Sequence, residues 1–287
     1  MDSPNFFKKK SYINCRGKLI DVSQPKVMGI INVTPDSFYA SSRVANLSDG
    51  KQRILEMVQQ GADMIDVGAY SSRPGAEHID EKQEQQRLEP FLDKLRTEFP
   101  DLVISLDTFR SSIAKWAVEK YQVDMINDIS AGGLDAAMFE TIAGLKVPYI
   151  LMHMVGTPQN MQSQTRYDNL ISAIISYFAQ KMEQLNLLGV ADVILDPGFG
   201  FSKNLDQNFE LLARLDELRI FEQPLLVGLS RKSMIYKHLQ STPDEALNGT
   251  TVLNTLALGK GASILRVHDV KQARECVQLY QKTQSFQ

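Results

Sequence analysis

From Lys26 onward, the chain alternates regularly between short apolar runs and longer amphipathic segments, and this alternation constrains the fold more than any other feature of the sequence. The apolar runs are rich in Val, Ile, Leu and Met and are too short for helices, so they predict buried strands. The predicted strands are 27–32, 64–68, 102–107, 125–128, 149–153, 193–196, 225–230 and 264–267. The segments between and after them predict helices over 51–60, 81–99, 112–120, 135–143, 167–188, 208–217, 243–258 and 270–282.

Strand-helix units of roughly 30 residues imply parallel strands joined by right-handed crossovers. Eight such units close naturally into a barrel, so a (β/α)8 TIM barrel ranks above an open, doubly wound sheet. We expect one barrel domain over residues 27–287, because no linker or low-complexity segment divides it. Residues 1–26 form an appendage in which Tyr12–Cys15 and Lys18–Asp21 flank Arg16-Gly17, a pattern that predicts a small hairpin.

The composition is that of an ordinary globular protein, with 43% hydrophobic and 23% charged residues and a formal net charge of −3. This balance gives no reason to expect a nucleic-acid or membrane partner. Cys15 and Cys276 are far apart and fit neither a zinc spacing nor a Cys-x-x-Cys motif, which favours a reducing compartment. The first residues lack the apolar core of a signal peptide. We therefore expect a soluble, cytoplasmic protein.

Polar residues follow nearly every predicted strand, and in a (β/α)8 barrel the strands' carboxyl ends hold the chemistry. The stretch VILDPGFGFSK places Asp196 at such an end, before a loop rich in glycine and phenylalanine. The other residues at these positions are Asn32, Ser71 to Arg73, Asp107, Asn127, Asp128, His153, Ser230 to Lys232, Arg266 and His268. A barrel with only a structural role has no need to gather such groups around one rim.

These groups suit two kinds of ligand. Asp107, Asn127 and Asp196 offer acceptors for the N–H edge of a flat heterocycle. Arg73, Arg266 and His268 offer donors and positive charge which, with Asn32, suit a phosphate or pyrophosphate bridged by magnesium. The segment from Leu229 to Ser233 ends a strand and opens a helix, so its free amides form a further anion site.

Blander interpretations remain for several of these residues. Asn127-Asp128 is also consistent with a simple Asx turn, and Asp196 with a turn before Pro197. His153 is better explained as a hydrogen-bonded structural residue than as a catalyst. The residues Met152, Met154 and Met161 are typical of core or loop packing rather than of a cofactor site. Gly198-Phe199-Gly200 matches neither GxGxxG nor the P-loop spacing.

Eight runs, in order, resemble bacterial dihydropteroate synthases of the pterin-binding family. They are GIINVTPDSF (29–38), SSRPGA (71–76), SLDTF (105–109), INDIS (126–130), LMHMVGTPQNMQ (151–162), LDPGFGFSKN (195–204), GLSRKSM (228–234) and LRVHDV (265–270). The resemblance covers the chain from Val27 to the last helix. It implies a transferase of folate biosynthesis that condenses 6-hydroxymethyl-7,8-dihydropterin pyrophosphate with 4-aminobenzoate, giving 7,8-dihydropteroate and pyrophosphate.

The resemblance also implies a role for each matching residue. Asp196 and Asn127 would bind the amino-pyrimidine edge of the pterin, Asp107 another edge of the ring, and Lys232 would lie over the pterin near its carbonyl. Asn32 would be a magnesium ligand. The pyrophosphate would be held by Arg73, Arg266 and His268, and Ser72 would lie between the substrates. The amides around Ser233 would receive the aminobenzoate carboxylate, in a pocket lined by Phe38, Pro74 and Phe201 where sulfonamides compete. A homodimer is implied as well.

Loss of pyrophosphate from the pterin methylene would leave a delocalised cation, so stabilising the leaving group is the main catalytic task. The resemblance assigns that task to magnesium, Arg266 and His268, and Asp107 would face the developing cation. The aniline nitrogen is neutral at pH 7, so no strong base is needed.

The sequence departs from the family pattern at three places: Tyr39 to Ser42 replace Ser-Asp-Gly-Gly, Tyr70 replaces a common glutamate, and Ser72 a common threonine. Two alternatives stay open. A methyltetrahydrofolate-handling barrel of the corrinoid methyltransferase kind gives no reason for Lys232, Arg266 and His268 to converge on an anion. A catalytically silent pterin-binding protein is favoured by the altered first loop.

Overall fold

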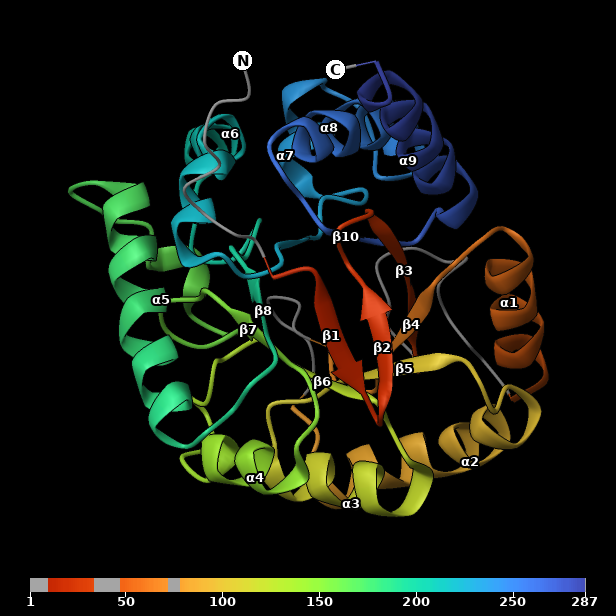
Figure 1. Ribbon diagram of the computed structural model, residues 1–287. Coiled ribbons are helices and arrows are strands. Elements are labelled where there is room, and N and C mark those ends of the chain that lie inside the picture. Colours follow the sequence, from red (N-terminus) through yellow and green to blue (C-terminus); the bar gives the residue numbers. More distant parts are fainter. Residues whose placement is uncertain (1–9, 34–46, 72–77, 287) are drawn as a thin grey trace.

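The eight predicted strands form one parallel sheet in the computed structural model, which describes residues 10–33, 47–71 and 78–286 (Figure 1). The strands are β3 (Lys26–Asn32), β4 (Met64–Gly68), β5 (Val103–Asp107), β6 (Met125–Asp128), β7 (Tyr149–Met152), β8 (Val193–Asp196), β9 (Leu226–Val227) and β10 (Ile264–Val267). Their order in the sheet is β8-β7-β6-β5-β4-β3-β10-β9. The predicted (β/α)8 barrel is confirmed.

The sheet closes where β9 meets β8, and this is its shortest pairing. A single parallel bridge joins Leu195 to Leu225, and the Leu195 N–H donates to the Pro224 carbonyl at 2.9 Å. The predicted strand over 225–230 was too long, because the chain turns after Gly228. The Lys232 N–H donates to the Leu229 carbonyl, and Arg231 adopts a φ of +52°.

Helices cover the outside of the sheet (Figure 1). They are α1 (Leu47–Gln59), α2 (Glu81–Glu98), α3 (Ser111–Tyr121), α4 (Met138–Leu145), α5 (Leu170–Leu187), α6 (Leu205–Ala213), α7 (Ser233–His238), α8 (Leu247–Gly259) and α9 (Val270–Gln284), with 3₁₀ turns at Met161–Ser163, Leu215–Phe221 and Asp244–Ala246. The helix predicted over 208–217 begins earlier, because Asn204 and Gln207 form a capping box at its start.

Alternation along each strand produces two separate cores. Side chains that point outward from the barrel, such as Ile65, Leu106 and Leu195, pack against the helices. Side chains that point inward at the strands' amino ends fill the bottom of the barrel with an apolar layer. That layer consists of Met28, Met64, Val103, Met125, Ile150, Ile194, Leu226 and Ile264.

The predicted hairpin is present as β1 (Tyr12–Cys15) and β2 (Lys18–Asp21), and it closes the floor of the barrel. Figure 1 shows the two strands crossing the end of the barrel that faces the viewer. Ile13, Cys15 and Val22 are buried against the bottom apolar layer. Burial raises the pKa of the Cys15 thiol to about 12, so this cysteine is an unreactive packing residue.

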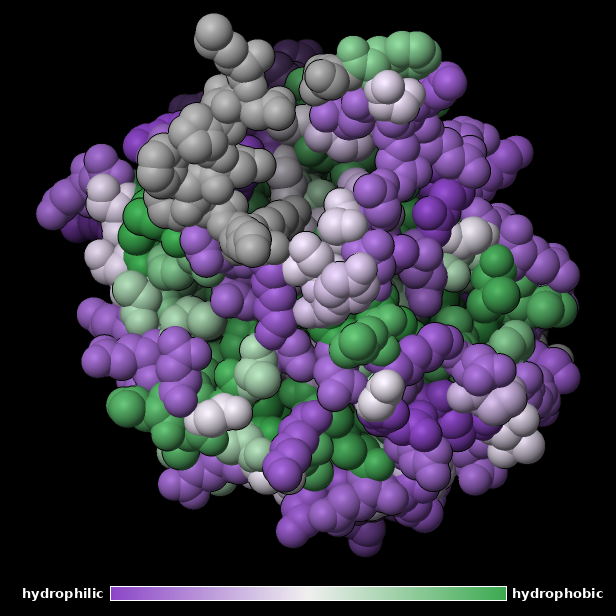
Figure 2. Space-filling view, in the orientation of Figure 1, coloured by the Kyte–Doolittle hydropathy of each residue, from purple (hydrophilic) through white to green (hydrophobic). Residues whose placement is uncertain are grey.

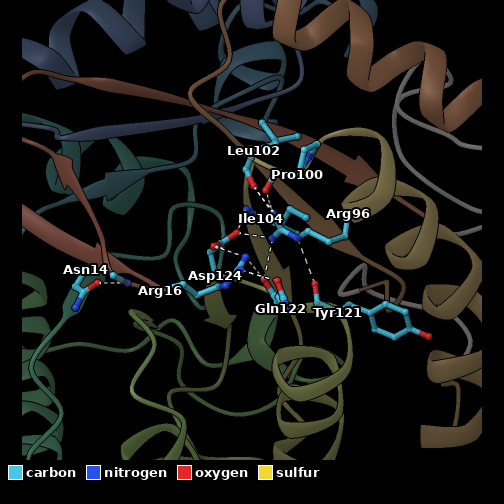
Figure 3. A network of polar contacts seen from close by, with 10 residues as sticks. Asn14, Arg16, Arg96, Pro100, Leu102, Ile104, Tyr121, Gln122 and Asp124 are labelled. Carbon is cyan, nitrogen blue, oxygen red and sulfur yellow. Dashed lines mark hydrogen bonds and ion pairs between the residues drawn. The ribbon is translucent and has the colours of Figure 1, made fainter.

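A polar network centred on Asp124 fastens the hairpin to the barrel floor (Figure 3). The Asp124 carboxylate accepts from Arg96 at 2.7 Å, from the Ile104 N–H at 2.9 Å and from Arg16 of the hairpin at 3.4 Å. The Arg96 guanidinium also donates to the carbonyls of Tyr121, Pro100, Leu102 and Gln122. Both oxygens of this carboxylate therefore have donors.

The face that carries the hairpin mixes hydrophilic and hydrophobic residues in small groups (Figure 2). Among the helices of residues 10–33, 47–71 and 78–286, we find none with the length and apolar character that a membrane span requires.

Candidate functional site

A polar layer lies directly above the apolar floor, two residues further along the strands toward their carboxyl ends. Strand register sets it: Met28 pairs with Met64, and two residues further Ile30 pairs with Asp66. Asp66 in turn lies beside Ser105, and Met152 beside Asp196. Beside the apolar Ile30 and Met152, the inward positions at this level hold the polar residues Asp66, Ser105, Asn127, Asp196 and Arg266, and all of these polar residues but Arg266 are buried.

Asp66 lies at the centre of this layer and is fully buried, with 0% exposure. Its Oδ2 accepts from Arg266 Nε at 2.6 Å and from Asn127 Nδ2 at 3.0 Å. Its Oδ1 has no hydrogen-bond partner among the described residues, and neither does Asn127 Oδ1 or Ser105 Oγ. Buried polar atoms rarely stay unpaired in a native protein, so these three atoms indicate a place where a polar ligand binds.

Arg266 joins Asp66 to Asp107 at the top of β5. Arg266 Nη2 donates to Asp107 Oδ2 at 2.9 Å. Burial raises the pKa of Asp107 to about 7; Arg266 lowers it and the charge of Asp66 raises it. The pKa of Arg266 is raised above its usual value because the attraction of Asp66 and Asp107 outweighs the effect of burial. The single positive charge of Arg266 is therefore shared between the two carboxyl groups.

Asp196 ends β8 and begins a loop with a fixed shape. Its Oδ1 accepts from the Gly198 N–H at 2.8 Å. Gly198 has a φ of +70°, and a Cβ at this position would lie 2.1 Å from the His153 carbonyl oxygen. Only glycine fits there. Burial raises the pKa of Asp196, while the nearby charge of Lys232 lowers it.

Lys232 approaches the same loop from the other side of the seam between β8 and β9. Its ammonium donates to the Phe199 carbonyl and lies 5.0 Å from the centre of the Phe201 ring. Burial lowers the pKa of Lys232 to about 8; Asp196 opposes this shift and Arg266 adds to it. Asp196, Lys232 and Phe201 therefore lie close together at the barrel mouth.

His268 follows β10 and is oriented by Ser230. Ser230 Oγ accepts from the His268 N–H at 3.2 Å and lies 3.1 Å from His268 Nδ1. Burial and the charge of Arg266 lower the pKa of His268 to about 3, so the ring is neutral at pH 7. We assign the Nε2–H tautomer, because the Ser230 hydroxyl can then donate to Nδ1.

An apolar wall closes the remaining side of the mouth. It consists of Phe109, Ile129, Met152, Met154 and Met161, with Tyr70 and Phe201 packed against it. The Tyr70 hydroxyl lies 3.1 Å from His78 Nδ1 and accepts from Gln159 Nε2 at 3.0 Å. The methionines are packing residues, as the sequence indicated. The mouth thus combines an apolar surface for a flat ring with hydrogen-bonding groups at its edges.

Comparison with known proteins agrees with this geometry. The family model described as pterin binding enzyme matches residues 28–268. The chain is 40% identical to the Escherichia coli K12 dihydropteroate synthase over 94% of its own length and 95% of the relative's. It is 43% identical to the Synechocystis dihydropteroate synthase, covering 85% of each chain. The chain belongs to the dihydropteroate synthase family of pterin-binding enzymes.

Solved structures of the dihydropteroate synthase family share the whole fold. A Yersinia pestis dihydropteroate synthase in a sulfonamide complex matches with a TM-score of 0.91 and 39% identity, covering 96% of this chain and 99% of that one. A Xanthomonas albilineans dihydropteroate synthase with 4-aminobenzoic acid matches with a TM-score of 0.86 and 31% identity, covering 96% and 98%.

Most of the predicted site residues that the structure describes come together at one end of the barrel. Asp107, Asn127, Asp196, Lys232, Arg266 and His268 all surround the barrel mouth. Asn32 ends β3 beside Gly68, whose neighbour in the next strand is Asp107. Ser233 is the first residue of α7 and is partly buried. Phe38, Ser72, Arg73 and Pro74 lie outside the described residues.

Three expectations about the predicted site residues need correction. The sequence divided them into acceptors for a heterocycle and donors for an anion, but Arg266 binds Asp66 and Asp107 and so joins both sets. His268 was expected to bring positive charge, and its lowered pKa makes it a neutral hydrogen-bonding group instead. Asp128 is not part of the mouth, because it points outward and accepts from Tyr149, Ser130 and Gly132.

The sequence analysis missed Asp66 and Lys203. Asp66 lies in the middle of the run Met64–Gly68, and a carboxylate at an inward position of a buried strand was the available signal. Lys203 is 3% exposed and donates to His153 Nδ1 and to two carbonyls. Nothing in the pattern of the loop distinguishes this lysine from a solvated one.

Proposed function

We propose that this chain is an active dihydropteroate synthase, which joins 6-hydroxymethyl-7,8-dihydropterin pyrophosphate to 4-aminobenzoate in folate synthesis. The observation that carries the proposal is the set of unpaired buried atoms on Asp66, Ser105 and Asn127, next to Asp196 and Lys232. A pterin presents several N–H groups and ring acceptors along one flat edge. Such an edge matches acceptors and donors that the protein leaves without partners.

The pterin would lie across the mouth, with its edge toward the barrel axis. Asp196 and Asn127 would accept from its amino-pyrimidine N–H groups, and Lys232 would donate to its carbonyl. The wall of Met152, Met154 and Ile129 offers an apolar surface to the ring face. The charges at the mouth support this orientation. Lys232 offers a donor for the carbonyl of the pterin, and Asp196 offers an acceptor for its N–H groups.

The pyrophosphate would lie toward Arg266 and His268, as well as Arg73, which falls outside the described residues. His268 would donate a neutral hydrogen bond through Nε2, fixed by Ser230. Arg266 pairs with Asp66 and Asp107. It would therefore lie between the bound pterin and the pyrophosphate and contact both. Its Asp107 partner would face the methylene carbon, where positive charge develops.

Magnesium would neutralise part of the pyrophosphate charge when it is bound. Asn32 offers one amide oxygen for it, and the described residues contain no cluster of three or more metal-binding side chains. Mg²⁺ in phosphate sites commonly takes only one or two protein ligands and completes its shell with water and phosphate oxygens. A single ligand at Asn32 fits an ion that arrives with the substrate.

The reaction needs one bond broken and one formed. The C–O bond between the pterin methylene and the pyrophosphate breaks, and the electron pair leaves with the pyrophosphate. The aminobenzoate nitrogen then forms the C–N bond and releases a proton to water. Phe201 and the first amides of α7 near Ser233 would hold the aminobenzoate in line, so the protein supplies position rather than a strong base.

Pyrophosphate release tests this function. Purified protein is given dihydropterin pyrophosphate and magnesium, with and without 4-aminobenzoate. We expect release that depends on aminobenzoate, together with formation of 7,8-dihydropteroate. Binding of the pterin substrate without any release would instead identify a silent pterin-binding protein.

We further propose a homodimer in the cytoplasm. Support for the dimer comes from exposed apolar side chains one helical turn apart on α8, Val252 and Leu256, with Leu239 exposed after α7. A sedimentation measurement tests it, since charged substitutions at Val252 and Leu256 should convert a dimer into a monomer.

A further inference from the structure

We propose that Lys203 is a positioning residue that, by bracing the loop after β8, fixes the places of the Lys232 ammonium and the Phe201 ring. This inference rests on the proposed function, because it gives Lys232 and Phe201 their ligands. Lys203 itself is buried behind the loop and touches neither substrate in that scheme.

The Lys203 side chain has a complete set of partners. Its Nζ lies 3.0 Å from the Gly198 carbonyl oxygen, 3.0 Å from the Phe201 carbonyl oxygen and 3.0 Å from His153 Nδ1. Burial lowers the pKa of Lys203 to about 7, and the protonated group has three N–H donors for the three acceptors that surround it. Lys203 therefore ties the two ends of the turn 198–201 to β7.

His153 is a rigid acceptor for this bond. Its backbone N–H donates to the Asp196 carbonyl at 2.9 Å, which joins the end of β7 to the end of β8. Its ring stands edge-on to Tyr177, with 4.8 Å between the ring centres, and it is 1% exposed. Burial and the charge of Lys203 lower the pKa of His153 well below its usual value, so the ring is neutral. We assign the Nε2–H tautomer, because Nδ1 then has a lone pair that accepts from Lys203.

The braced turn carries the contacts of Lys232. The Phe199 carbonyl, which accepts from Lys232, lies between the two carbonyls that Lys203 holds. Phe201 presents its ring to the Lys232 ammonium, while its carbonyl binds Lys203. Lys203 and Lys232 thus contact the same four-residue turn. Lys203 supports the turn from behind, and Lys232 would bind the ligand.

Other bonds hold the later part of the loop and supply a control. The Tyr167 hydroxyl donates to the Ser202 carbonyl at 3.0 Å, and Ser202 Oγ accepts from the Val155 N–H at 3.0 Å. These contacts stabilise the loop without touching Gly198, Phe199 or the Phe201 carbonyl. Tyr167→Phe therefore removes an anchor of the loop but leaves the bracing by Lys203 intact.

A double-mutant cycle tests the proposal. Affinity for 7,8-dihydropteroate is measured by calorimetry for the wild type, Lys203→Met, Lys232→Met and the double variant, with kcat and KM for the pterin substrate alongside. We expect Lys203→Met to weaken binding at least tenfold in the wild-type background and less than threefold in the Lys232→Met background. A group that acts through another shows this loss of additivity, whereas a merely structural residue gives equal effects in both backgrounds.

Three further variants guard against a general folding defect. Tyr167→Phe should lower the melting temperature while changing dihydropteroate affinity less than twofold. His153→Gln keeps an acceptor for Lys203 and should retain binding, whereas His153→Leu should lose it as Lys203→Met does. This pair decides the matter if Lys203→Met does not fold.

The possible outcomes separate this proposal from the proposed function. Equal effects of Lys203→Met in both backgrounds, or equal affinities of His153→Gln and His153→Leu, overturn the positioning role even if the wild type is fully active. A wild type that binds dihydropteroate without turnover overturns the synthase function, and the cycle in binding affinity still judges Lys203. A wild type that does not bind dihydropteroate overturns both.

Discussion

The two ends of the barrel both contain buried carboxylates beside arginines, but only the floor satisfies them completely. At the floor, both oxygens of Asp124 have donors, and Arg96 spends its remaining donors on backbone carbonyls. At the mouth, Asp66 and Asn127 each keep an oxygen without a partner among the described residues. The floor is built for stability, whereas the mouth holds unused polar capacity that a ligand can complete.

Removing the ammonium at the mouth should produce the largest functional loss. We expect Lys232→Met to lower kcat/KM for the pterin substrate about 10²- to 10³-fold, the size of effect typical for a positioned electrostatic group. Stability should stay the same or rise, because a buried lysine with a lowered pKa is costly to keep charged. Pyrophosphate release and urea unfolding are the two measurements. A large decrease in the free energy of unfolding of Lys232→Met would contradict the view that the mouth serves ligand binding rather than stability.

Breaking the floor should do the reverse. Asp124→Ala leaves Arg96 and Arg16 without their shared carboxylate, and removing one partner of a buried pair costs about 3–5 kcal/mol. The folded variant should keep kcat/KM within about twofold of the wild type, since Asp124 lies far below the mouth. Asp216→Ala is the matched control. Asp216 forms an exposed ion pair with Lys260, and such a pair contributes about 0–1 kcal/mol to the free energy of unfolding.

Asp107 should make stability depend on pH at the mouth. Its pKa is raised to about 7 in the folded protein, mainly by burial, so the folded state binds a proton more tightly than the unfolded state does. The contribution of Asp107 to stability should therefore fall as pH rises from about 4 to 7, opposite in sign to the contribution of His268, whose pKa is lowered. We expect the fall to be on the order of 1–3 kcal/mol, and Asp107→Asn should remove it. Urea unfolding of both proteins between pH 4 and pH 8 measures the difference.

The hairpin tether should give the smallest effect. Arg16 contacts Asp124 at 3.4 Å and is about one-third exposed (34%), while Arg96 remains in place when Arg16 is removed. Arg16→Ala should cost about 1 kcal/mol or less, with unchanged activity. A cost near that of Asp124→Ala would mean that the hairpin, rather than Arg96, satisfies the carboxylate.

Much of the fold and of the mouth could be predicted from the sequence, because the period of a strand and the place of a loop are local properties. The eight strands follow from short apolar runs, and the residues at their carboxyl ends fall at the mouth. The pairing of Arg266 with Asp107 could not be read in this way, since 159 residues separate them and only barrel closure brings them together. Asp66 was missed because it lies in the middle of a strand rather than at its carboxyl end, where the functional residues were sought. The neutral state of His268 depends on burial, which no sequence pattern reports.

The seam between β8 and β9 has a kinetic consequence. One bridge and a two-residue strand close the sheet there, so fewer backbone amides are protected across this junction than across the five-residue pairings of β4 with its neighbours. Asp196 lies at the end of β8, on one side of the junction, and Lys232 follows β9, on the other side. A bound molecule that contacts both residues would add interactions across this junction, where the backbone forms few. Amide exchange near Leu195 and Leu225 should then slow when the site is filled, and the lifetime of the closed barrel becomes tied to occupancy.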